Sequence, residues 1–211
     1  MRVLGCLVEK ERATPDYYPM TLNGLIAGCN QKSSRHPVVA YSETTVSEAV
    51  SRLQDKHLTH RITSSESRVP RYRHVFSEAY ALTNQQTAAL CVLMLRGAQT
   101  GGEIRQRTNR IYEFESLSDV EDALESLLVK KPRPLAARLP RRSGEKEPRW
   151  VHLLGDEPDE ASTEPSQDAE AAPAPAPRES RGDKIEAELA ELRSEVADLR
   201  AELARLRAEL E

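Results

Sequence analysis

The chain has 211 residues, of which 38% are apolar and only 4% aromatic, and its formal net charge at neutral pH is −4. This length allows one or two domains, and the apolar fraction is sufficient for two small helical cores. The chain contains no apolar run of the length that a bilayer requires, and its first residues are too charged for a secretory signal, so we expect a cytoplasmic protein.

The charges are distributed unevenly along the chain. Residues 1–78 contain 11 Lys and Arg against 8 Asp and Glu, residues 79–155 contain 12 against 9, and residues 156–211 contain 7 against 17. The body is therefore mildly basic, which permits binding to a polyanion, and it is followed by an acidic tail. The cysteines are far apart in apolar patterns, and we expect three reduced core thiols at Cys6, Cys29 and Cys91.

Apolar periodicity and turn residues predict three helices and a hairpin in the first part of the chain. The helices are expected at 1–11, 21–30 and 43–56, and the strands at 59–63 and 71–76. Ser42 is a suitable N-cap for the third helix. A polar turn, 31–37, separates the second and third helices, and the loop 64–70 joins the strands. Because no capping residue precedes the first helix, we expect further residues ahead of Met1.

The same order of elements is predicted again in residues 79–155. Three pairs have the capping-box spacing: Thr83 with Gln86, Thr100 with Glu103, and Ser118 with Glu121. They predict helices near 84–96, 101–110 and 119–130. Strands at 135–139 and 150–154 then enclose the loop 140–148.

These two parts are copies of one unit. At an offset of 74, the third helices align through Val46, Ala49, Val50, Leu53 and Lys56 on Val120, Ala123, Leu124, Leu127 and Lys130. Further along, Pro70-Arg71-Tyr72 aligns with Pro148-Arg149-Trp150. Helices followed by a hairpin predict a winged helix-turn-helix, in which the hairpin is the wing. We expect the two aromatic side chains to pack the wing onto the helices, with stacking on a base as the alternative.

The composition changes after residue 155. Residues 156–182 are rich in Asp, Glu, Ala and Pro, and we expect a disordered acidic linker. Residues 183–211 carry a heptad pattern, whose apolar positions are Ile185, Leu189, Leu192, Val196, Leu199, Leu203, Leu206 and Leu210. Glu at the g positions faces Arg at the e positions only in a parallel pair, so we predict a parallel homodimer. A trimer, or one amphipathic helix docked on its own body, is the alternative.

The sequence contains no catalytic constellation. Gly101-Gly102 lacks the Lys and Ser/Thr of a phosphate-binding loop, and His57 and His60 have no metal-ligand partners at a suitable spacing. We therefore predict a protein that is not an enzyme and has no metal, cofactor or small-molecule ligand.

A basic winged-helix protein is expected to bind nucleic acid. The charges on the third helices argue against binding through these helices. Their predicted outward faces each carry two carboxylates, Glu48 and Asp55 in the first copy and Asp122 and Glu125 in the second. Carboxylates oppose phosphate contact. The candidate DNA contacts therefore lie in the turn 31–37 and on the wings: Lys32, Arg35, His36, Arg61, Arg68, Arg71, Arg73, Arg138, Arg141, Arg142 and Arg149. Ordinary solvated hairpin charge is the alternative.

Three stretches resemble a known bacterial family. They are LVEKERATPDYYPMTLNGLIAGCNQKSSRHPV, LRGAQTGGEIRQRTNRIYEF and PRWVHLLG. They are similar to the YceH-like proteins of uncharacterised function, and the resemblance covers about residues 1–155, with a heptad tail that also fits. It implies tandem winged-helix domains in a cytoplasmic protein and supplies no activity.

The sequence thus predicts a mostly α protein with small β hairpins. Two winged helix-turn-helix domains, 1–78 and 79–155, precede the linker and the coiled coil. The leading hypothesis is a dimeric, non-enzymatic DNA-binding protein of the regulator type that grips the DNA backbone through its wings. The alternative is a protein-interaction scaffold that docks partners through acidic third helices and the coiled coil.

Overall fold

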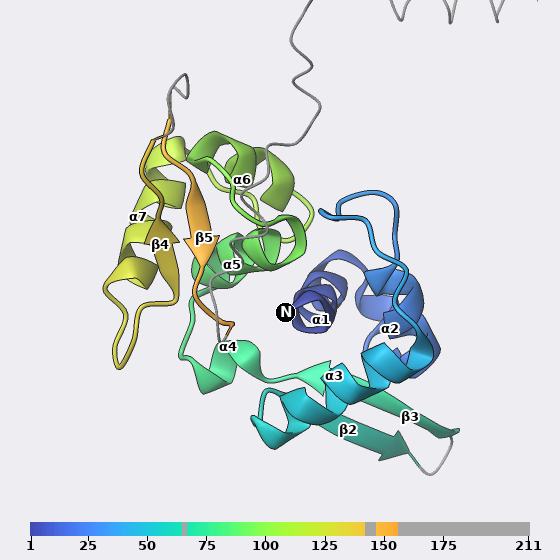
Figure 1. Ribbon diagram of the computed structural model, residues 1–211. Coiled ribbons are helices and arrows are strands. Elements are labelled where there is room, and N and C mark those ends of the chain that lie inside the picture. The colour runs from blue at the N-terminus through green and yellow to red at the C-terminus, as the bar shows by residue number, and fades with distance from the viewer. Residues whose placement is uncertain (65–66, 142–146, 156–211) are drawn as a thin grey trace, which may run out of the picture. The chain divides into compact units, whose positions relative to one another are not determined.

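The computed structural model describes residues 1–64, 67–141 and 147–155 (Figure 1). The predicted linker 156–182 and coiled coil 183–211 lie outside the described residues, as does Arg142. The described residues belong to one compact unit of helices with two small antiparallel sheets, which confirms the predicted mostly α class with β hairpins.

The first repeat, residues 1–78, has the predicted three helices and hairpin, together with two short elements that the sequence pattern did not reveal. Its elements are α1 (Arg2–Ala13), η1 (Pro15–Tyr17), β1 (Met20–Thr21), α2 (Leu22–Cys29), α3 (Glu43–Asp55), β2 (Thr59–Ser64) and β3 (Ser67–His74). The strands extend further into the hairpin than expected, so the predicted loop 64–70 is largely strand. The two-residue strand β1 is too short to produce an alternating pattern.

A short helix, α4 (Phe76–Ala79), spans the junction between the first repeat and the second repeat, residues 79–155. The elements of the second repeat are α5 (Asn84–Arg96), α6 (Gly101–Thr108), α7 (Leu117–Leu128), β4 (Ala136–Arg138) and β5 (Trp150–His152). The capping boxes at Thr83 and Thr100 are confirmed.

The third predicted capping box is wrong. The side chain of Ser116, not Ser118, caps α7, and the Asp119 carboxylate accepts from the Ser116 backbone N–H. Both serines have an acidic residue three positions later, so the spacing alone does not distinguish them. The helix begins with Leu117, two residues earlier than expected.

The first sheet has the strand order β1-β3-β2, in which Met20 pairs with Tyr72 and Thr21 with Arg71. The second sheet contains only β4 and β5, but an isolated bridge joins Gln99 to Trp150. Trp150 is the counterpart of Tyr72 in the repeated Pro-Arg-aromatic motif. The Gln99 bridge is therefore the counterpart of β1, and the duplication seen in the sequence extends to the strand pairing.

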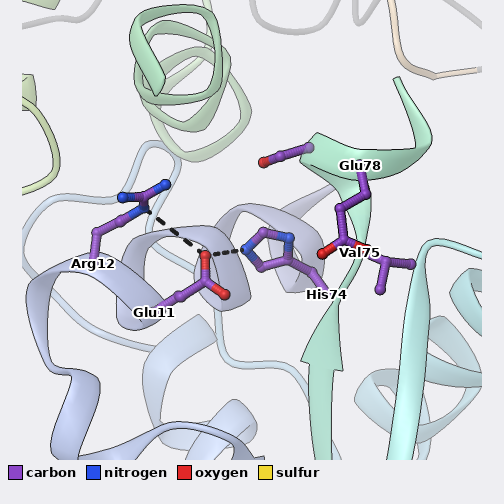
Figure 2. Close-up of a pocket in the computed structure, with 6 residues that line it drawn as sticks. Glu11, Arg12, His74, Val75 and Glu78 are labelled. Atoms are coloured by element: carbon purple, nitrogen blue, oxygen red, sulfur yellow. Dashed lines mark hydrogen bonds and ion pairs between the residues drawn. The ribbon is translucent and has the colours of Figure 1, made fainter. Parts of the chain in front are cut away.

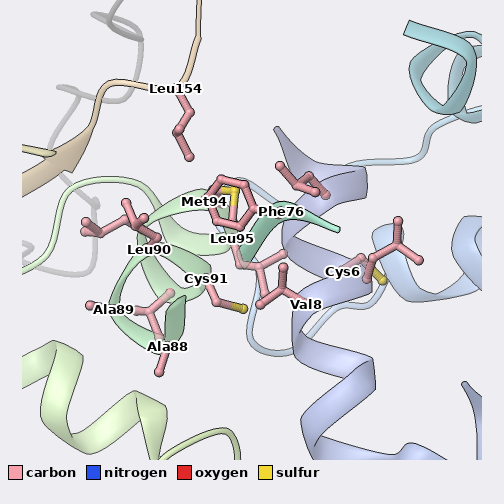
Figure 3. Packing of buried hydrophobic residues seen from close by; sticks show 14 of the residues in the cluster. Cys6, Val8, Phe76, Ala88, Ala89, Leu90, Cys91, Met94, Leu95 and Leu154 are labelled. Carbon is pink, nitrogen blue, oxygen red and sulfur yellow. The ribbon is translucent and has the colours of Figure 1, made fainter. Parts of the chain in front are cut away.

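Helices α1 and α5 are equivalent elements of the two repeats, and they pack against each other (Figure 1). Figure 3 shows the side chains that meet there, among them Val8 from α1 and Leu95 from α5. The two repeats therefore share a continuous apolar core. Cys6, Cys29 and Cys91 are free thiols buried in this core, as expected.

Polar contacts also fasten the repeats together. The backbone N–H of His36 donates to the carbonyl of Leu95 at 2.9 Å, and the Cys91 thiol donates to the carbonyl of Gly5 at 3.4 Å. The first bond joins the backbones of the two repeats directly, and the second ties a side chain of α5 to the backbone of α1.

Two glycines in α2 have different surroundings and allow a matched test of how closely α1 and α2 pack within the first repeat. A methyl group at Gly28 would collide with the Cys6 sulfur on α1, whereas a methyl group at Gly24 would meet its neighbours at ordinary distances of 3.4 Å or more. We expect Gly28→Ala to destabilise the protein by about 1–3 kcal/mol through overpacking. Gly24→Ala should be neutral or stabilising by up to about 1 kcal/mol, because alanine favours the helix.

Urea denaturation of both variants would measure these changes. Adding Cys6→Ala to Gly28→Ala removes the colliding sulfur and should restore part of the lost stability. Equal stabilities for the two single variants would contradict the close approach of α1 and α2.

Candidate nucleic-acid interface

The predicted basic residues divide into exposed side chains and side chains that hold the fold together. Arg35 belongs to the second group, since only 5% of its surface is exposed. Its guanidinium donates two hydrogen bonds to the Glu9 carboxylate, at 2.9 and 2.6 Å, and one to the carbonyl of Gly28 at 3.0 Å. Arg35 therefore fixes the turn 31–37 onto α1 and α2. Its buried guanidinium is not positioned to contact a phosphate group.

The rest of the turn 31–37 is only partly free. Lys32 and His36 are exposed. The backbone, however, is held by the bond from His36 to Leu95 and by Arg2, which donates to the carbonyl of Pro37 at 2.7 Å. The turn thus presents two side chains from a fixed backbone.

The outer face of the first sheet carries a group of basic side chains, of which Arg71 and His60 are exposed and Arg73 is half-buried. Arg73 pairs with His60 across β3 and β2, and Arg71 pairs with Ile62. Because alternate residues of a strand share a face, Arg71, Arg73 and His60 lie together on one side. We call these three residues the basic sheet face. Arg61 lies opposite Tyr72 on the other side, yet it is also exposed, and Arg68 lies further along β3.

The arginine of each Pro-Arg-aromatic motif makes the same contact. Arg71 donates to the carbonyl of Pro19 at 3.0 Å, and Arg149 donates to the carbonyl of Ala98 at 3.2 Å. Pro19 precedes β1, and Ala98 precedes Gln99, the residue that replaces β1 in the second repeat. The motif therefore recurs because each wing strand is anchored in the same way. The sequence predicts Arg71 and Arg149 only as candidate DNA contacts and does not reveal this structural role.

The aromatic residues of the motif also have a structural role. Trp150 is buried, and Tyr72 packs partly buried against the same core, so the expected packing of wing onto helices is confirmed. The histidine two residues later repeats as well: the ring Nδ1 of His74 accepts from the N–H of Phe76, and that of His152 from the N–H of Leu154.

The second wing has two exposed arginines among its described residues, and one of them lies over an aromatic ring. Arg141 is exposed, and Arg138 is exposed with its guanidinium 5.9 Å from the centre of the Trp150 ring. Arg149 is half-buried and also contacts Glu103 at 3.2 Å. The second wing is therefore the weaker candidate for phosphate contact.

The third helices expose their carboxylates, as their periodicity predicts. Glu48 and Asp55 on α3 are exposed, and so are Asp122 and Glu125 on α7. Val46 and Leu53 of α3 are buried in the core with their counterparts in α7. These faces repel phosphate unless a particular base accepts a carboxylate contact.

A polar cavity of about 380 Å³ lies where α1, β3 and α4 meet (Figure 2). Glu11 of α1 accepts a hydrogen bond from Nε2 of buried His74 at 3.0 Å. Because Nδ1 of the same ring accepts from Phe76, a neutral ring protonated at Nε2 satisfies both contacts. Arg12 donates to the Asn84 side chain at 2.6 Å, which joins this site to the start of α5. Sequence patterns did not single out this junction.

Hydrogen bonding affects the ionisation of this site. The bond from His74 holds the pKa of Glu11 below its ordinary value, against the opposing effect of burial. Nearby, burial raises the pKa of Tyr18, whose hydroxyl oxygen accepts the N–H of His74 at 2.7 Å. Glu11 therefore stays a carboxylate, and Tyr18 stays a neutral phenol.

Within residues 1–64, 67–141 and 147–155, no three His, Cys, Asp or Glu side chains lie close enough together to hold a metal ion. In the same part of the chain, no helix combines the length and apolar character needed to span a bilayer.

Fold and site together define a duplicated helical protein with a small sheet in each repeat and basic side chains on the outside of the first. Residues 1–145 match the family described as "Protein of unknown function, DUF480", and the chain belongs to this family. A UPF0502 protein of Opitutus terrae is 47% identical over 193 residues, which cover 92% of this chain and 81% of that protein.

Other bacterial relatives are equally well covered. A UPF0502 protein of Solibacter usitatus is 48% identical over 92% of this chain and 90% of its own length. One of Vibrio parahaemolyticus is 42% identical over 91% of this chain and 88% of its own length. The resemblance to a bacterial family of unknown function is thus confirmed, and the family's name describes no enzymatic activity. The YceH-like label rests on the resemblance alone.

The depressed pKa of Glu11 predicts how stability responds to acid. An unfolded glutamate has a pKa of about 4.3. Because the folded pKa is lower, the contribution of Glu11 is complete above the unfolded value and is lost as the pH falls through the folded value. We expect Glu11→Gln to be less stable than wild type at pH 7 and to lose less stability between about pH 5 and pH 3.

Melting temperatures across this pH range would test the expectation. Glu78→Gln removes a carboxylate from the same cavity but leaves the bond to His74 in place, so it should lose stability as steeply as wild type. If Glu11→Gln also followed the wild-type profile, the bond between Glu11 and His74 would have no role in acid sensitivity.

Proposed function

We propose that each repeat is a winged helix-turn-helix unit and that the protein is a non-enzymatic, regulator-type protein that binds duplex DNA. The order helix, strand, helix, helix, strand, strand in the first repeat supports this assignment. In proteins of this kind, a helix and a wing approach the duplex. Three buried free thiols fit a reducing cytoplasm.

The basic sheet face carries this proposal. Arg71, Arg73 and His60 lie side by side on the outside of the first wing. Among the described residues, the guanidinium groups of Arg73 and Arg61 form no hydrogen bond or ion pair, although the charge of half-buried Arg73 also acts on Glu11. Arg71 uses one donor on Pro19 and keeps the others. Unengaged guanidinium groups on a flat sheet match the spaced charges of a phosphate backbone.

The acidic third helices define the mode of binding. Their exposed carboxylates would be repelled by the DNA phosphates, so these helices are poorly suited to enter a groove and contact base edges. The first wing should therefore contribute most of the affinity through the backbone. Contacts to phosphate position a protein without reading sequence, so we expect weak sequence specificity.

A second function is favoured by the surface of α7. Leu128 and Val129 are exposed at its C-terminal end, next to a face that carries Asp122 and Glu125. An apolar end beside carboxylates suits a basic segment of a partner protein. In this alternative the protein is an interaction scaffold that does not bind DNA.

The heptad tail supports a parallel homodimer for either function. Its apolar positions and its Glu and Arg flanks lie in residues 183–211, outside the described residues. A dimer would present two basic sheet faces to one duplex and would increase the affinity through effective concentration.

DNA binding is tested by titrating the full chain with a labelled duplex at several salt concentrations. We expect tight binding at low salt and a linear decrease of log affinity with log salt. Arg73→Ala should weaken binding and reduce the salt slope by about 1, because one phosphate contact is lost. Arg61→Ala should have a smaller effect of the same kind, since it faces away from Arg73.

Arg52→Ala is a matched control in the same repeat. Arg52 is exposed on α3, and its guanidinium lies 3.7 Å from the Glu48 carboxylate on the acidic face of that helix, so its removal should leave the salt slope unchanged. Melting temperatures of Arg61→Ala and Arg52→Ala should equal that of wild type, because both side chains are exposed, whereas that of Arg73→Ala should be slightly lower. Absence of binding at low salt would eliminate the DNA-binding proposal and leave the scaffold alternative.

The oligomeric state is tested by sedimentation. A chain that ends at Gly155 lacks the whole heptad pattern, so it should sediment as a smaller assembly than the full chain. A chain with Leu199→Lys and Leu203→Lys should behave in the same way, because charges at neighbouring a and d positions disrupt the seam. Identical assemblies in all three would contradict the parallel dimer.

A further inference from the structure

Tyr17 is the most exposed large hydrophobic residue among the described residues, with 77% of its surface accessible. One exposed apolar side chain needs no explanation by itself. Tyr17 is distinguished by a held backbone and by its place on a loop that is hydrogen-bonded to Arg71 of the basic sheet face.

The backbone around Tyr17 is held on both sides. Tyr17 ends the 3-10 helix η1, where its N–H donates to the carbonyl of Thr14 at 3.1 Å. The next residue, Tyr18, packs its ring edge-on against His74, and its hydroxyl accepts the N–H of His74. The ring of Tyr17 is therefore presented from a fixed point, which lowers the entropy lost when it is covered by a ligand.

The loop that carries Tyr17 is joined to the basic sheet face. Arg71 donates to the carbonyl of Pro19, two residues after Tyr17, and β1 begins at the following residue. β1 pairs with β3, the strand that carries Arg71 and Arg73. The loop that carries the exposed ring of Tyr17 thus leads into the edge strand β1, and β1 pairs with the central strand that carries Arg71 and Arg73.

We propose that Tyr17 stacks on an unpaired base of a nucleic acid whose phosphates lie along Arg71 and Arg73. This inference rests on the proposed DNA-binding function and specifies the form of DNA. A positive surface with a neighbouring aromatic ring is the combination by which proteins hold single strands, because every base has a face for stacking. A base inside a duplex is already stacked on its neighbours, so Tyr17 selects DNA with a single-stranded extension.

The test compares two labelled DNAs with the full chain: a blunt duplex, and the same duplex with a short single-stranded overhang. Wild type should bind the overhang DNA more tightly. Tyr17→Ala should weaken binding to the overhang DNA by about tenfold, since one stacked base is lost, and should leave binding to the blunt duplex unchanged. Tyr17→Phe keeps the ring and should behave as wild type.

Two further measurements separate stacking from other effects. The salt slope of Tyr17→Ala should equal that of wild type, because no phosphate contact is removed. Its melting temperature should not change, because the side chain is mostly exposed. Val129→Ala removes a side chain of similar exposure, 73%, from the second repeat and should bind both DNAs as wild type does.

The outcomes distinguish the two proposals. If wild type binds both DNAs equally, or if Tyr17→Ala binds the overhang DNA as tightly as wild type, the stacking role is wrong and the DNA-binding function stands. If wild type binds neither DNA at low salt, both proposals fail. Equal weakening of both DNAs by Tyr17→Ala would also overturn the preference for unpaired bases.

Discussion

The packing of α1 on α5 is the contact on which the rest of the structure depends. It joins the first helix of one repeat to the first helix of the other through side chains such as Val8 and Leu95 (Figure 3). The turn 31–37 is fastened to the same pair of helices through His36 and Arg35. Because the core is continuous across this contact, neither repeat can change its position without disturbing the other. The first wing is thereby held on a rigid support.

Buried polar contacts also fix how the turn 31–37 sits on this helix pair. The Arg35 guanidinium is satisfied by two Glu9 oxygens and the carbonyl of Gly28. A buried ion pair that loses one partner leaves an unpaired charge, which typically costs about 3–5 kcal/mol. A charged residue in a basic turn can therefore be essential for folding without contacting any ligand.

Much of the fold could be predicted from the sequence because its periodicity and capping residues are local signals. The apolar stripes of α3 and α7 identified the buried residues Val46 and Val120, and two of three capping boxes were placed correctly. The strand β1 depends on tertiary pairing with β3, which a local pattern does not encode. The start of α7 depends on which of two serines caps the helix, and the spacing does not distinguish them. The site was less predictable. Side-chain charge identified Arg35 and Arg73 equally, and only burial separates them.

The α1–α5 contact also has a consequence for how such a chain can be divided. Since the two helices occupy equivalent places in a duplicated unit, their contact is the intrachain counterpart of an isologous interface between two identical subunits. Either half on its own would leave one apolar helix face uncovered. A second copy of the same half carries a similar face, so isolated halves are suited to self-association or exchange of helices. The duplication has in this sense placed both partners of a dimer on one polypeptide.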